Sequence, residues 1–160
     1  MVNTNESSNY SFDIIKINSI IHDGLIYHSQ IEYNQKSLYL KIPIYVRIFE
    51  QKKLIYKNIF KKVYSVPIFV YDLIFYNFKN ISIKDFAKID SYLVNQLKNK
   101  EGEFIFYADP DFKISIYGQN TYLKFLSDDN IKGYTKLIRI NFLPIEKLGL
   151  EIFEIEKGIK

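Results

Sequence analysis

The stretch Ser37–Phe49, SLYLKIPIYVRIF, has the clearest pattern in the chain. Aliphatic residues occupy every second position from Leu38 to Ile48, and the positions between them carry rings, charges and one proline. Because side chains of a strand point alternately to opposite faces, this pattern predicts a β-strand with its aliphatic face in the core. Pro43 has no N–H to donate, so we expect the strand to lie at a sheet edge or to bulge there.

Strand patterns also occur on both sides of this stretch. Phe12–Ile21 and Leu25–Tyr33 predict a β-hairpin around His22-Asp23-Gly24, with His28 facing Asn18 on the polar side. Lys52–Tyr64 fits a helical stripe as well as a strand, and we favour the strand. The remaining expected strands are Val66–Tyr71, Glu103–Ala108, Phe112–Tyr117, Tyr134–Leu143 and Leu150–Glu156. The strands at Glu103–Ala108 and Phe112–Tyr117 form a second hairpin about Asp109-Pro110-Asp111, and Thr121–Leu126 is left unassigned.

Ser82–Lys100 is the segment that we expect to form the principal helix. Ser82 is a suitable N-cap, and Phe86, Ile89, Leu93 and Leu97 form one stripe at helical spacing. Asp72 is expected to cap a shorter turn or helix that ends at Phe78. The expected fold is therefore α+β: a mainly antiparallel sheet of about seven to nine strands, sandwich- or barrel-like, with one principal α-helix near residues 83–99.

Length and composition indicate an ordinary globular protein. A chain of 160 residues with 48% hydrophobic residues predicts one domain, which we place at residues 12–160 after a flexible tail at 1–11. The start lacks the features of a signal peptide, and Val66–Phe78 is shorter than the roughly 20 apolar residues that span a membrane. We therefore expect no integral membrane association and a cytoplasmic or other intracellular location, or the virion if the protein is viral.

The positive charge is concentrated in the middle of the chain. Residues 51–100 contain ten lysines and three acidic residues, whereas the segments before and after carry a small negative net charge. The cluster consists of Lys52, Lys53, Lys57, Lys61 and Lys62. Residues written with A and T codons, such as isoleucine, lysine and tyrosine, dominate the chain, which indicates an AT-rich genome. The position of the lysines is therefore more informative than their number.

No pattern in the sequence predicts catalysis, a metal site or a cofactor. The two histidines, His22 and His28, are expected to be structural or solvent-facing, because no third ligand is evident. Asp109-Pro110-Asp111 is explained by turn preference, although Asp-x-Lys fragments also occur in metal-dependent nucleases. No glycine-rich phosphate loop occurs, and no cysteine is present to act as a nucleophile or ligand. We therefore expect a protein that is not an enzyme.

The non-aliphatic face of Ser37–Phe49 is the main candidate binding surface. It carries Tyr39, Lys41, Tyr45, Arg47 and Phe49, which interleave rings with cations. Such a face suits a protein interface or stacked nucleic-acid bases, unless a second layer covers it and its rings belong to the core. Arg47 and Arg139, the two arginines among 22 basic residues, are expected to pair with carboxylates.

Together these features predict a non-enzymatic interaction or structural subunit of a larger protein assembly. An origin in a phage or mobile element would fit the AT-rich coding. The expected partner is another protein or a second copy of the chain. The alternative is a nucleic-acid-binding module that uses the aromatic and basic strand face together with the lysine cluster.

Overall fold

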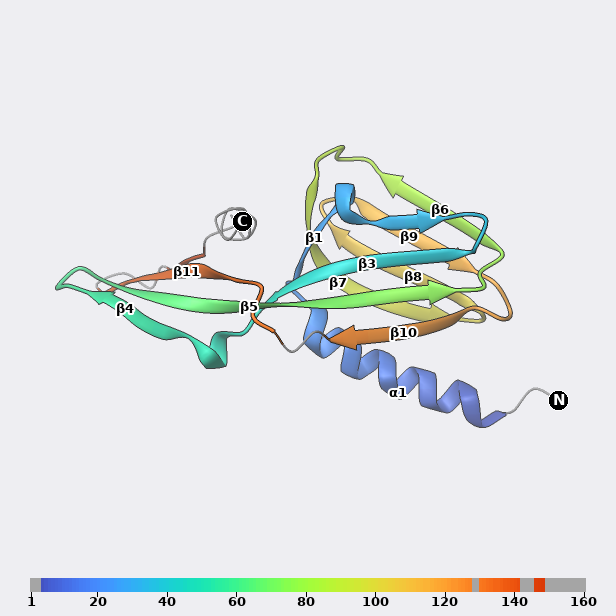
Figure 1. Cartoon of the computed structure of the whole chain (residues 1–160), viewed down its shortest axis with the longest axis horizontal. Coiled ribbons are helices and arrows are strands. Elements are labelled where there is room, and N and C mark those ends of the chain that lie inside the picture. Colours follow the sequence, from blue (N-terminus) through green and yellow to red (C-terminus); the bar gives the residue numbers. More distant parts are fainter. Residues whose placement is uncertain (1–3, 128–129, 142–145, 149–160) are drawn as a thin grey trace. The chain divides into compact units, whose positions relative to one another are not determined.

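The computed structural model describes residues 4–127, 130–141 and 146–148, with side chains described for 13–127 and 130–141 (Figure 1). Its helix is α1 (Thr4–Ile21), and two short 3-10 turns are η1 (His28–Gln30) and η2 (Phe49–Gln51). The strands are β1 (Leu25–Tyr27), β2 (Glu32–Asn34), β3 (Tyr39–Arg47), β4 (Lys53–Lys57), β5 (Lys61–Tyr76), β6 (Asn80–Asp85), β7 (Ser91–Lys100), β8 (Glu103–Asp109), β9 (Phe112–Tyr117), β10 (Tyr122–Ser127), β11 (Gly133–Ile140) and β12 (Glu146–Leu148).

The chain divides into two units, to which β3 and β5 both contribute. Unit 1 comprises residues 1–44 and 71–126, and unit 2 comprises residues 45–70 and 127–160. In unit 1 the hydrogen-bonded strand order is β5-β3-β1-β7-β8-β9-β6, with β10 beside β5 and β2 beside β3. In unit 2, β4 and β11 both pair with β5, and β12 pairs with β11.

The core of unit 1 lies on the inner face of its curved sheet. Strands β8 and β9 bury alternate residues, including Phe104, Phe106 and Ile114, as the twofold period of a strand requires. Phe75 of β5 packs against Phe104 at 5.3 Å between ring centroids, so strands distant in the strand order meet across the core. In Figure 1, β3, β5 and β10 accordingly lie in front of β7, β8 and β9. Each fully buried phenylalanine contributes about 1.5–3 kcal/mol of hydrophobic stabilisation.

The expected hairpin of Phe12–Ile21 with Leu25–Tyr33 is wrong in its first half, because residues 4–21 form α1. The buried residues are Ile14, Ile17 and Ile21, which share one helical face, whereas Ile15 is 69% exposed. The β-branched isoleucines favoured a strand locally, but burial of this stripe outweighs that preference. The helix ends at Ile21, and Asp23 in the following turn has a φ of 62°, in the left-handed region.

Asn18 joins α1 to strand β7 through two hydrogen bonds with one residue. Its Nδ2 donates to the Leu97 carbonyl oxygen at 2.8 Å, and its Oδ1 accepts from the Leu97 N–H at 2.7 Å. Strand β1 pairs with β7 only from Leu93 towards the N-terminus of β7. The Asn18 amide therefore makes the hydrogen bonds to the Leu97 backbone that β1 would make if it extended further along β7. Asn18 does not face His28, as the expected hairpin required.

The expected helix at Ser82–Lys100 is also wrong, because this segment forms β6, a turn and β7. Three residues of the predicted helical stripe are exposed, and Phe86 is 72% exposed. A β-bulge between Val94 and Gln96 inserts one extra residue into β7, so its buried positions are Tyr92, Val94 and Leu97. The interrupted alternation resembles helical spacing, which explains the error.

Gly102 ends a strand rather than a helix. Glu101 and Gly102 have φ values of 51° and 79°, and they connect Lys100 to its partner Glu103. Two consecutive residues with positive φ make the type I′ turn that suits a two-residue hairpin. β7 and β8 are therefore joined by the tightest kind of hairpin connection.

Several other expectations are confirmed or corrected. The hairpin about Asp109-Pro110-Asp111 is confirmed as β8 and β9, and the strand at Ser37–Phe49 is confirmed as β3. The helix expected after Asp72 is wrong, because β5 continues to Tyr76. The edge position that Pro43 suggested for this strand is wrong, because β3 lies between β5 and β1. Continuing the register of Glu32 with Lys41 places Pro43 opposite η1, where the neighbouring chain is not extended.

The fold class is confirmed at its coarser level. The described residues form a mainly antiparallel sheet with one helix, but the strands outnumber the seven to nine expected and the helix is N-terminal. Lys52–Tyr64 contains β4 and the start of β5, which confirms the preference for strand. The strand expected at Leu150–Glu156 lies outside the described residues. The tail at 1–11 and the single domain stay expectations.

Candidate functional site

The β4–β5 hairpin of unit 2 is held in shape by two asparagines. Asn58 Oδ1 accepts hydrogen bonds from the N–H groups of Phe60 and Lys61, both at 2.8 Å. Asn141 Nδ2 donates to the carbonyl oxygens of Asn58 and Ile59 at 3.3 and 3.0 Å. Asparagine is suited to such turns because its short side chain bonds the backbone nearby. The turn is therefore fixed by its own polar groups, and its apolar side chains are not required to hold it.

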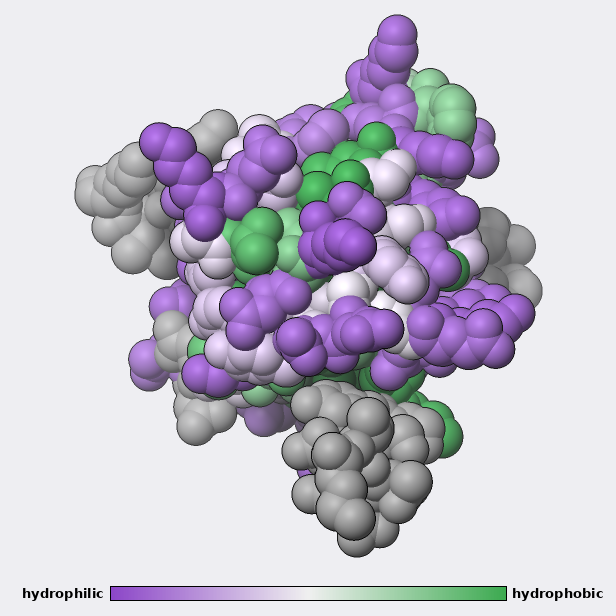
Figure 2. Space-filling model, turned by 90° about the vertical axis from the view of Figure 1, so that its right-hand side faces the viewer, coloured by the Kyte–Doolittle hydropathy of each residue, from purple (hydrophilic) through white to green (hydrophobic). Residues whose placement is uncertain are grey.

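Apolar side chains protrude from this hairpin. Within seven consecutive residues, five large side chains are more than half exposed: Leu54, Ile55, Tyr56, Ile59 and Phe60. Every residue of β4 is exposed, so neither face of this strand contributes to the core. The face of the molecule in Figure 2 is mostly hydrophilic, with apolar residues in small separate areas, as is normal for a protein surface. Five large exposed apolar side chains on one hairpin instead indicate an interaction site.

Positive charge surrounds the exposed apolar residues. Lys57, Lys62 and Arg139 occupy opposed positions on β4, β5 and β11. Like charges in opposed positions on neighbouring strands reduce stability, so this row is not explained by stabilisation of the sheet. The Lys61 ammonium lies 5.8 Å from the ring centroid of Tyr56. The hairpin thus combines an apolar surface with a positive rim.

A hollow of about 430 Å³ lies beside the base of the hairpin, also in unit 2. Lys52 and Lys53 line it together with Pro67, Ile131 and Tyr134. Ile131 and Tyr134 are each 45% exposed. The hollow can therefore accept an apolar side chain beside two ammonium groups, which extends the surface formed by residues 54–60.

The residues predicted on the outer face of Ser37–Phe49 do not form one exposed surface. Tyr45 is buried at 6% exposure, whereas Phe49 is exposed on η2. Tyr39 is half-buried and contacts Tyr76 edge to face at 5.4 Å, and desolvation by burial raises the pKa of its hydroxyl. Lys41 pairs with Glu32 at 3.5 Å between Nζ and Oε1. A binding role for these residues stays a prediction, and burial of Tyr45 removes the central ring from it.

Arg47 and the lysine cluster belong to unit 2, whereas Tyr39 and Lys41 belong to unit 1. Arg47 and Lys62 are half-buried, and the other four lysines of the cluster are exposed. The guanidinium of Arg139 lies 5.7 Å from the ring centroid of Tyr64. Exposed lysines and exposed apolar residues therefore coincide on one hairpin, which the sequence alone did not predict.

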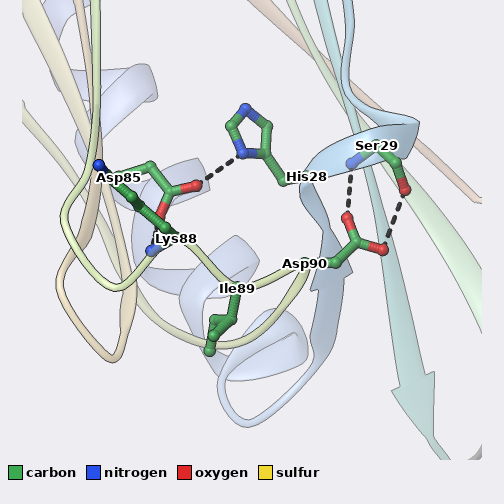
Figure 3. Close-up of a pocket in the computed structure, with 6 residues that line it drawn as sticks. All are labelled: His28, Ser29, Asp85, Lys88, Ile89 and Asp90. Atoms are coloured by element: carbon green, nitrogen blue, oxygen red, sulfur yellow. Dashed lines mark hydrogen bonds and ion pairs between the residues drawn. The ribbon is translucent and has the colours of Figure 1, made fainter.

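A polar network in unit 1 fixes η1 against the turn between β6 and β7 (Figure 3). His28 Nδ1 lies 2.8 Å from Asp85 Oδ2, and Asp85 also accepts hydrogen bonds from the Tyr92 hydroxyl and from the Lys88 N–H at 2.9 Å. Ser29 donates its N–H and its hydroxyl to Asp90 at 2.8 and 3.0 Å. Two carboxylates thus fasten two consecutive residues of η1.

The electrostatics of this network keep Asp85 charged. The hydrogen bond from Tyr92, with that from His28, holds the pKa of the Asp85 carboxyl below its usual range. Burial, followed by the bond to Asp85, raises the pKa of Tyr92. His28 Nδ1 faces Asp85, and the other ring nitrogen points away from Asp85 in Figure 3. This pairing resembles the orienting half of an acid–base site, but the Ser29 hydroxyl beside it is engaged by Asp90.

We interpret the network as structural, because it holds η1 against the turn between β6 and β7. It borders an open hollow of about 590 Å³, and among the described residues no group of three or more histidine, cysteine or acidic side chains is placed to hold a metal ion. The sequence did not indicate the pairing of His28 with Asp85, because 57 residues separate them. His22 contacts its neighbour Asp23 at the surface.

A comparison with protein-family models, curated proteins and solved structures finds no match to this chain. In the described part of the chain, no helix is long and apolar enough to cross a membrane.

Proposed function

We propose that the chain is a non-enzymatic subunit that binds another protein through the β4–β5 hairpin of unit 2. The observation that carries this proposal is the exposure of five large apolar side chains at residues 54–60, with Ile59 at 72% and Phe60 at 62%. Leaving this much apolar surface in water is unfavourable, and a partner that covers it removes that cost. A protein surface is the ordinary cover for such a patch.

The charge of the hairpin defines the partner further. Residues 51–70 contain five lysines and no acidic residue. A second copy bound through the same hairpin would place these lysines against each other, which is unfavourable. The partner is therefore a different protein surface, apolar at its centre and acidic at its rim. An assembly subunit docked in this way needs no catalytic group of its own.

Nucleic-acid binding by the same hairpin is the weaker alternative. Its lysines could contact phosphates and its two rings, Tyr56 and Phe60, could stack on bases. The other three exposed apolar residues, Leu54, Ile55 and Ile59, are aliphatic and offer no ring to a base. The buried centre of a protein interface is instead more apolar than the rest of the surface, so it accommodates aliphatic and aromatic side chains together. The mixture of groups on the hairpin therefore favours a protein partner.

The test is affinity purification from the protein's own cells with tagged wild-type chain and an Ile59→Ser/Phe60→Ser variant. We expect the wild type to retain a defined partner and the variant to lose at least tenfold of it, because two central apolar contacts are removed. The matched control is Phe86→Ser, since Phe86 is equally exposed but belongs to unit 1. Equal retention by both variants, or copurification of nucleic acid alone, contradicts the proposal.

A further inference from the structure

The outer face of the sheet formed by β6, β9, β8 and β7 carries a second pattern, independent of the hairpin in unit 2. Residues opposite one another across these strands share a face. One row across the four strands reads Lys84, Lys113, Tyr107 and Gln96, and the next reads Ser82, Ser115, Ile105 and Lys98. A third row reads Asn80, Tyr117, Glu103 and Lys100. The face is thus built of tyrosines, lysines and small polar residues.

This face is open to solvent. The inner residues of the same strands, such as Phe106 and Ile114, are buried, whereas every residue of the three rows is exposed or half-buried. The α1 helix reaches β7 through the backbone of Leu97, whose side chain lies on the buried inner face. No described segment therefore covers the three rows.

Cations and rings are in direct contact on this face. The ammonium groups of Lys98 and Lys113 lie 5.6 and 5.8 Å from the ring centroid of Tyr107, one from each neighbouring strand. Tyr117, 45% exposed, stands four residues along β9 from Lys113, a separation of about 13 Å at the rise of a strand. The face therefore holds two separate rings with lysines between and beside them.

The net charge of the face is positive. Lys84, Lys98, Lys100 and Lys113 lie on the three rows, and the acidic residue of these rows is Glu103, opposite Lys100. Asp109, the last residue of β8, continues the same face beyond them. The aspartates of the β8–β9 turn lie beyond the row of Lys113, at one end of the sheet. The other three lysines are thus available to an anionic chain that runs along the strands.

We propose that this face binds single-stranded nucleic acid, with bases stacked on Tyr107 and Tyr117 and phosphates held by Lys84, Lys98 and Lys113. Rings on an open β-sheet offer stacking to any base, because every base has a π-face. Flexible lysines adjacent to those rings supply the phosphate contacts. A duplex fits less well, because its bases are already stacked. The chain would then join a nucleic acid at unit 1 to a protein at unit 2.

The experiment measures binding of the full chain to a fluorescent oligothymidine of about 15 nucleotides by anisotropy, between about 50 and 200 mM salt. Contacts from three lysines predict a slope of log affinity against log salt of about −2, since each phosphate contact on a single strand contributes about −0.7. Each of Lys84→Gln, Lys98→Gln and Lys113→Gln is expected to make the slope less negative by about 0.7. Lys136→Gln, an exposed lysine of β11 in unit 2, is the matched control and leaves the slope unchanged.

Stacking is tested separately from charge. Tyr107→Ala and Tyr117→Ala are each expected to weaken binding at least fivefold, and Tyr107→Phe to bind like the wild type, because the ring is retained. Tyr33→Ala, on β2 and 42% exposed, is the matched tyrosine control. The proposal is wrong if the chain fails to bind at low salt, if both alanine variants bind normally, or if a duplex binds equally well. It is also wrong if binding depends only on the hairpin lysines.

Discussion

The Asn18 side chain ties α1 to strand β7 by hydrogen bonds, and replacing Asn18 with alanine removes them. The Asn18 amide makes two bonds to the Leu97 backbone, at 2.7 and 2.8 Å, and both are partly buried. Each such bond contributes about 0.5–1.5 kcal/mol net, so Asn18→Ala is expected to lower the free energy of unfolding by about 2 kcal/mol. Part of this loss arises because the Leu97 N–H and carbonyl lose their partner.

The assay is equilibrium urea unfolding followed by circular dichroism, with Ser19→Ala as the matched control. Ser19 is exposed on the same helix, and its hydroxyl donates only to the carbonyl of Lys16. We expect the control to change the free energy of unfolding by less than about 0.5 kcal/mol. If Asn18→Ala is as mild as Ser19→Ala, the docking of α1 on β7 is refuted, and a solvent-facing Asn18 in a hairpin becomes the better description.

Three further perturbations test other parts of the fold by the same unfolding assay. Ile17→Ala should cost about 2–5 kcal/mol because Ile17 is buried in the α1 stripe, whereas Ile15→Ala should cost well under 1 kcal/mol; similar costs would contradict the helix. Gly102→Ala should cost about 1 kcal/mol, purely from its φ of 79°, since no atom lies near an added Cβ; an unchanged midpoint would argue against the type I′ turn. The lowered pKa of Asp85 means that its contribution to stability is present above pH 4 or so and is lost as pH falls through the native pKa. Asp85→Asn should therefore show a smaller loss of stability than the wild type on acidification below about pH 4, and parallel pH profiles would disprove the fastening.

Features of the fold that depend on neighbouring residues were predictable from the sequence. The alternation in Ser37–Phe49 is preserved in β3, and turn residues at Asp109-Pro110-Asp111 identified the β8–β9 hairpin. In both segments the conformation that the neighbouring residues favour agrees with the observed burial, so the local sequence pattern was enough to predict the structure. The confirmed coarse fold class, an antiparallel sheet with one helix, follows from these segments.

The errors arose where long-range contacts override the local pattern. Isoleucines 14, 17 and 21 favour strand by shape, but the sheet of unit 1 buries them as a helical stripe. In β7 the bulge at Val94/Gln96 shifts the alternation, and Leu97 then falls at helical spacing from Leu93. A bulge has no reliable local signal in a single sequence. The local patterns therefore predicted a strand where α1 forms and a helix where β6 and β7 form.

The candidate surfaces were likewise predictable only in part from the sequence. The lysine cluster was visible in the sequence, but the exposure of Ile59 and Phe60 beside it required the structure, since apolar residues are buried by default. The proximity of Tyr107 to Lys98 and Lys113 depends on the register of three strands. Tyr45, by contrast, had the expected alternation and is nevertheless buried. Sequence thus indicated the residue types, and strand pairing decided which of them meet.

The most direct test of the proposed function is site-specific photocrosslinking in the protein's own cells. In one variant a photoreactive residue replaces Phe60 in the hairpin. In a second variant it replaces Phe86, which is similarly exposed in unit 1. We predict that the probe at position 60 forms one dominant crosslink to a protein, through a segment that contains apolar and acidic residues. The probe at position 86 should not form that crosslink. Absence of a protein crosslink at position 60, or the same products from both positions, would contradict a docking role for the hairpin.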